Sequence, residues 1–158
     1  MSEIITGIEK LGGGSGLSIT LLDSIQGSPG SSSTSFDYSG QIDNTKTLSD
    51  ISSYDFLMLN TYVQSENIWI LNSSTIIPIN KVNQSSSVPT FEISVTKYYK
   101  SGNNFLLANN MFQVMVYKES NTQKWKCYGY QTLTNKASSA PTYRFELYGI
   151  KKKGQHYE

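Results

Sequence analysis

Short runs of alternating apolar and polar residues constrain the fold of this chain more than any other feature of its sequence. Phe91, Ile93 and Val95 are separated by single polar residues, and Phe145 and Leu147 follow the same pattern near the end of the chain. Because side chains two residues apart lie on the same face of a strand, this period of two predicts half-buried strands. No window sustains the period of 3.6 residues that a helix requires.

The composition supports the same conclusion. Aromatic residues make up 12% of the 158 residues and charged residues only 16%, whereas soluble globular proteins carry roughly 25% charged residues. Uncharged polar residues must therefore coat the surface, and such a balance suits pleated sheets better than helices. The length fits a single folded core.

We expect an all-β fold, a jelly-roll-like β-sandwich knob of about ten short strands. Residues 54–63 are apolar on both faces and predict a central strand. Residues 111–118 and 124–131 predict a hairpin closed by the five polar residues 119–123. The other predicted strands lie at 17–22, around Phe36 and Tyr38, at 68–71 and 75–79 with a turn at 72–74, at 91–99, at 105–107 and at 143–150.

Glycine and serine are concentrated in the first third of the chain. Residues 12–16 and 27–33 have the composition of flexible linkers, which order poorly. We therefore divide the chain into a flexible N-terminal arm with one short strand (1–33), a sandwich knob (34–153) and a short C-terminal tail (154–158).

Charge and cysteine content exclude several classes of protein. The formal net charge is +1, so no long-range field draws in nucleic acid. No apolar stretch reaches the roughly 20 residues of a membrane span, and the first residues lack the pattern of a secretion signal. Cys127 is the single cysteine and His156 the single histidine, so we expect no disulfide, metal or cofactor.

The sequence does not predict an enzyme. A nucleophile needs a base within hydrogen-bond reach, and His156 lies third from the end of the chain. Asp50 and Asp55 are the only carboxylate pair that we consider for a glycosidase, and solvation of a strand end explains them equally well. Cys127 alternates with Trp125 and suits a core position.

Tyrosines and amides near the predicted turns favour a binding surface instead. An aromatic ring can stack on the apolar face of a sugar, and amide side chains can bond its hydroxyl groups. The alternative for any one tyrosine is a place at the core edge or in a subunit contact. The candidate binding residues are Tyr98, Tyr99, Asn103, Asn104, Asn109, Asn110, Asn121, Gln123 and Tyr130.

Two segments, LSDISSYDFLML at 48–59 and YRFELYGIK at 143–151, resemble parts of the C-terminal domains of tailed-bacteriophage fibre, needle and minor structural proteins. The resemblance spans roughly residues 40–153 and brings no active site with it. It implies a homotrimeric knob that binds a glycan or protein on the host cell surface. It also implies a place in the virion tail, next to other tail proteins, after synthesis in the bacterial cytoplasm. The sequence has no heptads or collagen-like repeat, so a stalk would lie elsewhere.

Three functions are compatible with these features. The first is a receptor-binding head, the second a structural decoration or capping protein of the virion, and the third, less favoured, a polysaccharide depolymerase. Eleven tyrosines and few charges predict surplus aromatic surface that a closed homotrimer would bury through aromatic rather than charged contacts.

Overall fold

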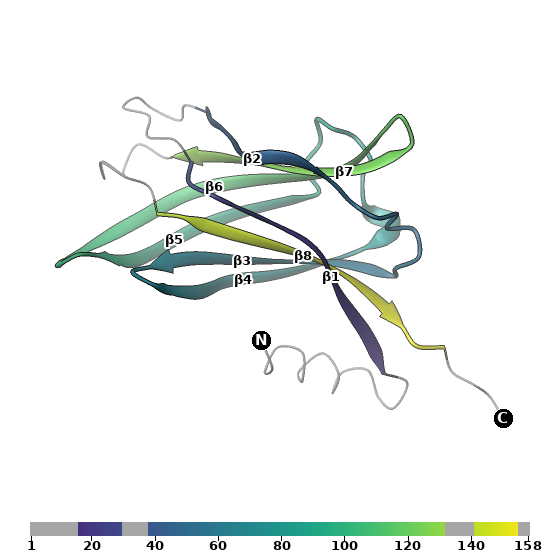
Figure 1. The fold of residues 1–158 in the computed structure, drawn as a ribbon, viewed down its shortest axis with the longest axis horizontal. Coiled ribbons are helices and arrows are strands. Elements are labelled where there is room, and N and C mark those ends of the chain that lie inside the picture. Colours follow the sequence, from purple (N-terminus) through teal and green to yellow (C-terminus); the bar gives the residue numbers. More distant parts are fainter. Residues whose placement is uncertain (1–15, 30–37, 132–140, 155–158) are drawn as a thin grey trace.

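A computed structural model describes residues 16–29, 38–131 and 141–154 and shows an all-β fold (Figure 1). Eight strands within these ranges form two antiparallel four-stranded sheets, and the only helical element there is a short 3₁₀ turn, η1 (Ile79–Lys81). The predicted β-sandwich is confirmed. The strands are β1 (Leu17–Gly27), β2 (Tyr38–Thr47), β3 (Phe56–Ser65), β4 (Ile68–Pro78), β5 (Phe91–Ser101), β6 (Asn104–Glu119), β7 (Thr122–Gln131) and β8 (Tyr143–Lys152).

The two sheets, which we call sheet A and sheet B, combine strands from both ends of the chain. Sheet A has the order β1-β8-β3-β4 and sheet B the order β2-β7-β6-β5. The predicted central strand is β3, which is buried along most of its length between β4 and β8. The two segments that carry the resemblance therefore meet in sheet A, where Phe56 lies opposite Ile150 and Leu59 opposite Leu147.

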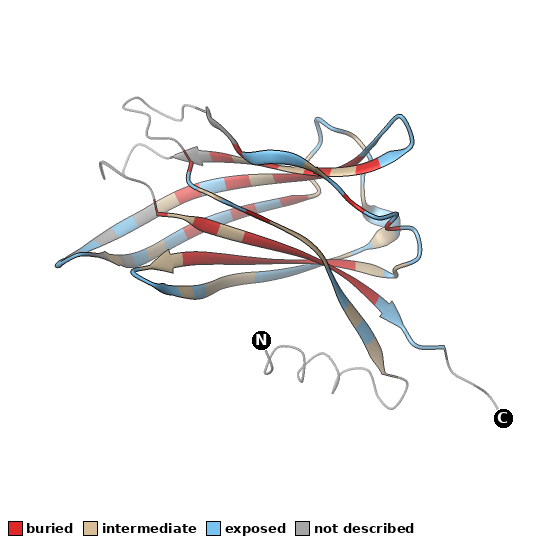
Figure 2. Ribbon diagram, in the orientation of Figure 1, coloured by how far each residue is buried: buried red, intermediate tan, exposed pale blue. Residues whose placement is uncertain are grey.

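One core fills the space between the sheets. Alternate residues of each strand enter it, as the period of two predicts, and Figure 2 shows buried residues at intervals along both layers. Trp125 from sheet B and Tyr143 and Phe145 from sheet A are fully buried. Cys127 is buried beside them, and burial raises the pKa of its thiol, so this cysteine acts as a small apolar residue.

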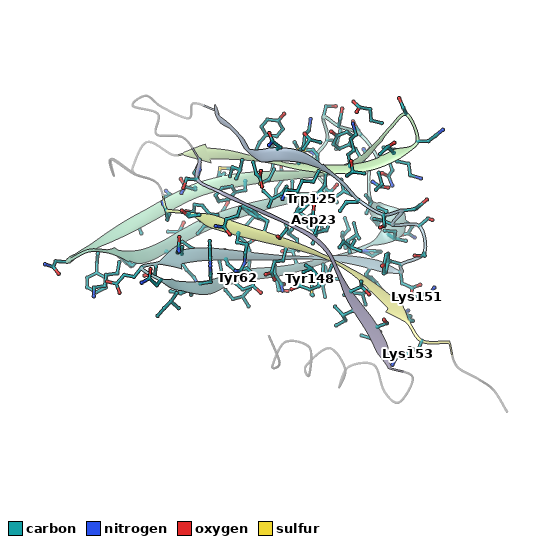
Figure 3. The ribbon with its side chains drawn as sticks, in the orientation of Figure 1. Asp23, Tyr62, Trp125, Tyr148, Lys151 and Lys153 are labelled. Atoms are coloured by element: carbon teal, nitrogen blue, oxygen red, sulfur yellow. The ribbon has the colours of Figure 1, made fainter. Side chains whose placement is uncertain are left out.

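Polar contacts also join the two sheets on one side of the core. The Trp125 indole nitrogen donates a hydrogen bond of 3.0 Å to Asp23, and Figure 3 shows the two residues together between the layers. A register shift in β1 between Leu21 and Asp23 places Asp23 opposite Leu147, a core residue. The bulge thus turns a carboxylate inward to satisfy a buried indole.

Several predicted strands have different bounds in the structure. The predicted pair at 68–71 and 75–79 is the single strand β4, because residues 72–74 accommodate a register shift opposite Thr61 and Tyr62 rather than a turn. The segments 105–107 and 111–118 likewise form the single strand β6. These mergers explain why the described residues hold eight strands where about ten were predicted.

The N-terminal strand is longer than predicted and is an integral part of sheet A. It pairs with β8 from Leu17 to Gly27, so residues 17–27 belong to the sandwich and not to an arm. The rest of the predicted flexible arm, apart from residues 16, 28 and 29, and residues 155–158 of the predicted tail lie outside the described residues, as do 132–140.

Candidate functional site

The end of the β5–β6 hairpin is the most exposed part of the described chain that carries large apolar side chains. β7 pairs with β6 only from Asn110 to Glu119, whereas β5 pairs with β6 along its whole length, to Asn104. Residues 96–109, which we call the hairpin arm, therefore form a ribbon of two strands. Its tip extends beyond the other strands in Figure 1.

A tight turn closes the arm. Ser101 lies opposite Asn104, so only Gly102 and Asn103 form the turn. Gly102 has a φ of 60° and Asn103 does not have a positive φ. This pattern is typical of a type II′ turn, whose first central residue is usually glycine because only glycine adopts that conformation without strain.

The outer face of the hairpin carries four exposed apolar side chains. Phe112 and Val114 of β6 point into the core, so the alternate residues of β6 face outward. Tyr98 is 72% exposed and Phe105 is 73% exposed, the highest values among the large hydrophobic residues whose side chains the structure describes. We call the set formed by Tyr98, Phe105, Leu107 and Met111 the hairpin patch.

Polar contacts fix the arm against the β3–β4 hairpin. The Lys97 ammonium donates a hydrogen bond of 3.1 Å to the carbonyl of Leu71. The Lys100 backbone amide donates to the Ser65 hydroxyl at 3.0 Å, and the Lys100 ammonium lies 3.1 Å from Glu66. The strand ladder and these contacts together hold the hairpin patch in a defined position.

The structure brings several of the predicted binding residues together on this arm. Tyr98 belongs to the hairpin patch, Asn103 lies exposed at the tip, and Asn109 accepts a hydrogen bond of 3.4 Å from Thr96. Tyr99 and Asn104 lie in the arm by their backbones, and their side chains are outside the described set. Two further candidates lie away from the arm, Tyr130 on β7 opposite Met111 and Asn121 in the β6–β7 turn.

Asn110 and Gln123 are buried, so the prediction that they lie on exposed loops is wrong. Asn110 shares the inward face of β6 with Phe112, and its amide donates a hydrogen bond of 2.5 Å to the hydroxyl of Tyr143. Gln123 donates to the carbonyl of Tyr117 at 2.8 Å. The predicted loop 119–123 is only the two-residue turn Ser120–Asn121, because Thr122 and Gln123 already belong to β7.

Sequence reasoning missed Phe105, Leu107 and Met111. The segment from Phe105 to Leu107 is apolar at three consecutive positions, so its own pattern does not show which face is buried. Counting back in twos from the core residue Phe112 assigns Phe105 to the outer face. That signal depends on treating 104–119 as one strand.

The acidic residues considered for catalysis have structural partners. Asp50 accepts a hydrogen bond of 2.7 Å from the backbone amide of Ser52, and this bond lowers the pKa of its carboxyl group. Asp55 accepts one of 2.7 Å from the backbone amide of Lys152. Both carboxylates therefore stabilise local backbone.

Three further observations bear on the class of protein. No group of three or more histidine, cysteine or acidic residues within residues 16–29, 38–131 and 141–154 could hold a metal ion. In the same ranges no helix has the length and apolar character needed to cross a membrane. Comparison with known protein families, curated proteins and solved structures found no significant match.

Proposed function

We propose that this chain is a non-enzymatic binding module, the receptor-recognition head of a bacteriophage tail appendage. The hairpin patch is the observation that carries the proposal, since large exposed apolar surfaces on a soluble domain mark interaction sites. The ligand would be a glycan or a protein on the host cell surface.

The chemistry of the arm suits such a ligand. Tyr98 and Phe105 offer aromatic surface for stacking on a sugar ring or an apolar side chain. Asn103 lies beside them at the tip, and its amide can both donate and accept hydrogen bonds. A rigid sandwich that presents a projecting loop is a common way to position a binding surface.

The topology is compatible with a jelly-roll-like knob. The pairs β1·β8 and β2·β7 join the first strands to the last strands in both sheets, and eight strands in two sheets are typical of jelly rolls. β3·β4 and β5·β6 are instead hairpins of consecutive strands. The phage assignment itself rests on the resemblance of residues 48–59 and 143–151.

We also propose that the head is a homotrimer within the virion tail. Ile76 of β4 and Leu21 of β1, both exposed, supply apolar surface on the outer face of sheet A, away from the hairpin patch. Three weak sites on one head would raise avidity by about 10²–10⁴. Light scattering on the purified chain measures the mass directly, and a stable monomer at micromolar concentration would contradict the trimer.

The second candidate function is a structural capping protein of the virion. It is favoured by the same exposed residues, Ile76 and Leu21, which a neighbouring virion protein could cover as well as a second copy could. The two functions differ in what the hairpin patch does. A capping protein does not need the patch to contact a cell, and a receptor-binding head does.

Adsorption of the purified, fluorescently labelled chain to a panel of bacterial strains tests the proposal. The double variant Tyr98→Ser, Phe105→Ser should lower adsorption about tenfold or more, because exposed aromatic residues dominate binding surfaces. Val88→Ser is the matched control, since Val88 is an exposed apolar residue between η1 and β5. Equal adsorption of both variants and the original chain would favour the capping function.

A further inference from the structure

A second cluster with binding chemistry lies on the outer face of sheet A. Leu57, Leu59 and Val63 of β3 enter the core, so Tyr62 faces the other way. Arg144 lies opposite Tyr62 on β8. The guanidinium carbon of Arg144 is 4.7 Å from the ring centre of Tyr62 and 4.7 Å from that of Trp69 on β4. Two aromatic rings thus fix the position of one cation.

A buried carboxylate lies next to this cation on the same face of β8. Glu146 is only 7% exposed, and its Oε1 lies 3.1 Å from the Arg144 Nε. Its Oε2 accepts a hydrogen bond of 2.5 Å from the Tyr148 hydroxyl. Burial and this carboxylate raise the pKa of both Tyr62 and Tyr148, so both hydroxyls stay protonated near neutral pH. Figure 3 shows the two tyrosines along sheet A.

The hydrogen-bonding capacity of Arg144 is largely unused within the described residues. A guanidinium has five N–H donors in one plane. The Nε lies close to Glu146, but its N–H is not aligned for a hydrogen bond. No terminal nitrogen of Arg144 donates a hydrogen bond to another described residue. The side chain is 26% exposed, so solvent or a ligand can reach it.

The arrangement favours an anion with two oxygens in one plane. The carboxylate of Glu146 is buried and bonded, whereas the Arg144 side chain is 26% exposed, so the charge that a ligand can reach is positive. Planar carboxylates bind such a fork through two parallel hydrogen bonds. The nearest surface positions hold uncharged amides, with Gln26 opposite Arg144 and Gln64 opposite Trp69.

We infer that the outer face of sheet A is a binding site for a saccharide that carries a carboxylate, such as a uronic acid unit. Arg144 binds the carboxylate, the edge of Trp69 contacts the sugar ring, and Gln26 and Gln64 bond hydroxyl groups. The site goes beyond the proposed function, because it lies on sheet A and the hairpin patch lies on sheet B.

Titration of the full ¹⁵N-labelled chain with methyl glucuronide, followed by NMR, tests the inference. The side-chain Nε–H signal of Arg144 and the indole signal of Trp69 should shift and saturate with a Kd of roughly 1 mM, as for a single weak site. Methyl glucoside, which lacks the carboxylate, should bind at least about tenfold more weakly, because the charge-assisted pair is lost. Equal binding of the two sugars, or no saturable shift, would overturn the inference.

Substitutions of Arg144 test whether its guanidinium binds the carboxylate of the sugar. Arg144→Gln should weaken glucuronide binding about tenfold, and Arg144→Lys should weaken it partly, since lysine keeps the charge and loses the fork. Lys126→Gln is the matched control, because Lys126 lies 5.2 Å from the ring centres of Tyr117 and Tyr128 on sheet B. If Arg144→Gln does not fold, Arg144→Lys decides, and wild-type binding by a folded Arg144 variant contradicts the site.

The hairpin double variant distinguishes this inference from the proposed function. Tyr98→Ser, Phe105→Ser should bind methyl glucuronide as the original chain does. Loss of glucuronide binding in that variant would place the sugar on the arm and overturn the sheet A site. Its cell adsorption is a separate measurement and bears only on the hairpin patch.

Discussion

The outer face of β6 is apolar at both ends, yet only one end is exposed. Near the tip of the hairpin arm, Phe105 and Leu107 are exposed to solvent. Toward the β6–β7 turn, Met115 and Tyr117 occupy the same face of the same strand and are only 4% and 5% exposed. Residue type therefore does not decide which apolar residues of this strand are available for binding.

The neighbours of each end explain the difference. At the covered end β7 flanks β6, and the Lys126 ammonium lies 5.2 Å from the ring centre of Tyr117. The segment before β5 adds cover, since Thr90 accepts a hydrogen bond from the Val116 amide and Gln84 accepts one from Gln123. The arm has only β5 beside it. An apolar stripe becomes a binding surface where the third strand stops.

Truncation of one aromatic side chain at each end of β6 should give the largest difference in the free energy of unfolding. Tyr117→Ala should lower the free energy of unfolding by about 2–4 kcal/mol, because large buried side chains leave cavities when truncated. Phe105→Ala should change it by less than about 0.5 kcal/mol, as is usual for exposed sites. Urea denaturation measures both. Similar losses for the two variants would show that the arm is covered in solution.

The two turns that flank β6 should give a smaller difference in stability. Gly102 has a φ of 60°, and a Cβ added there meets nothing within 4 Å. Gly102→Ala should therefore cost only the conformational penalty, about 1–2 kcal/mol. At the other turn Ser120 and Asn121 already have φ values of 48° and 64°, so Ser120→Gly should stabilise the chain by up to about 1 kcal/mol.

Thermal unfolding of both turn variants measures these opposite signs. Ser94→Gly in β5 serves as the strand control and should destabilise the fold. A neutral Gly102→Ala would mean that the arm tip contributes nothing to the stability of the fold.

The sequence predicted the fold class and the central strand well, because these follow from local patterns. Tyr143, Phe145 and Leu147 alternate, and all three are buried as predicted. The apolar run in 54–63 matches β3, buried by strands on both sides. A period of two and a run of apolar residues are both visible without knowledge of any neighbour.

The candidate site was less predictable because its exposure depends on distant strands. Asn110 and Asn109 are adjacent amides in the sequence, and their side chains lie on opposite faces of β6. Which one faces outward depends on the register of the whole strand. The exposure of Phe105 depends on where β7 ends, some 25 residues later in the chain, and no local pattern encodes that.

Removal of the Lys126 ammonium, which lies over the covered end of β6, should change the free energy of unfolding by still less. Lys126→Ala takes away the ammonium near Tyr117 and Tyr128, which is worth about 0.5–1 kcal/mol at an exposed site. Lys126→Arg should retain most of it, because arginine also stacks on rings. Denaturation curves of the two variants make the comparison, and equal losses would assign the effect to the lysine stem rather than to its charge.

Acidification should produce the smallest effect, and only at the covered end. Glu119 forms an ion pair and hydrogen bond with Lys124 beside the β6–β7 turn, and this partner lowers the pKa of its carboxyl group in the folded chain. A carboxyl group whose pKa is lower in the folded chain than in the unfolded chain stabilises the fold at pH values above its pKa in the unfolded chain, which is about 4.3. This stabilisation disappears as the pH falls through the pKa of the folded chain. Glu119 is exposed and Lys124 partly exposed, so solvent screening keeps the contribution small. Between about pH 5 and pH 3, Glu119→Gln should therefore lose slightly less stability than the original chain. Denaturation at each pH measures the difference. Glu92→Gln on β5 is the control, because Glu92 is a carboxylate without a lysine partner in the described chain. A Glu119→Gln curve that falls as steeply as the original would show that the turn ion pair is absent in solution, and the cover over Tyr117 would then depend on Lys126 and the segment before β5 alone.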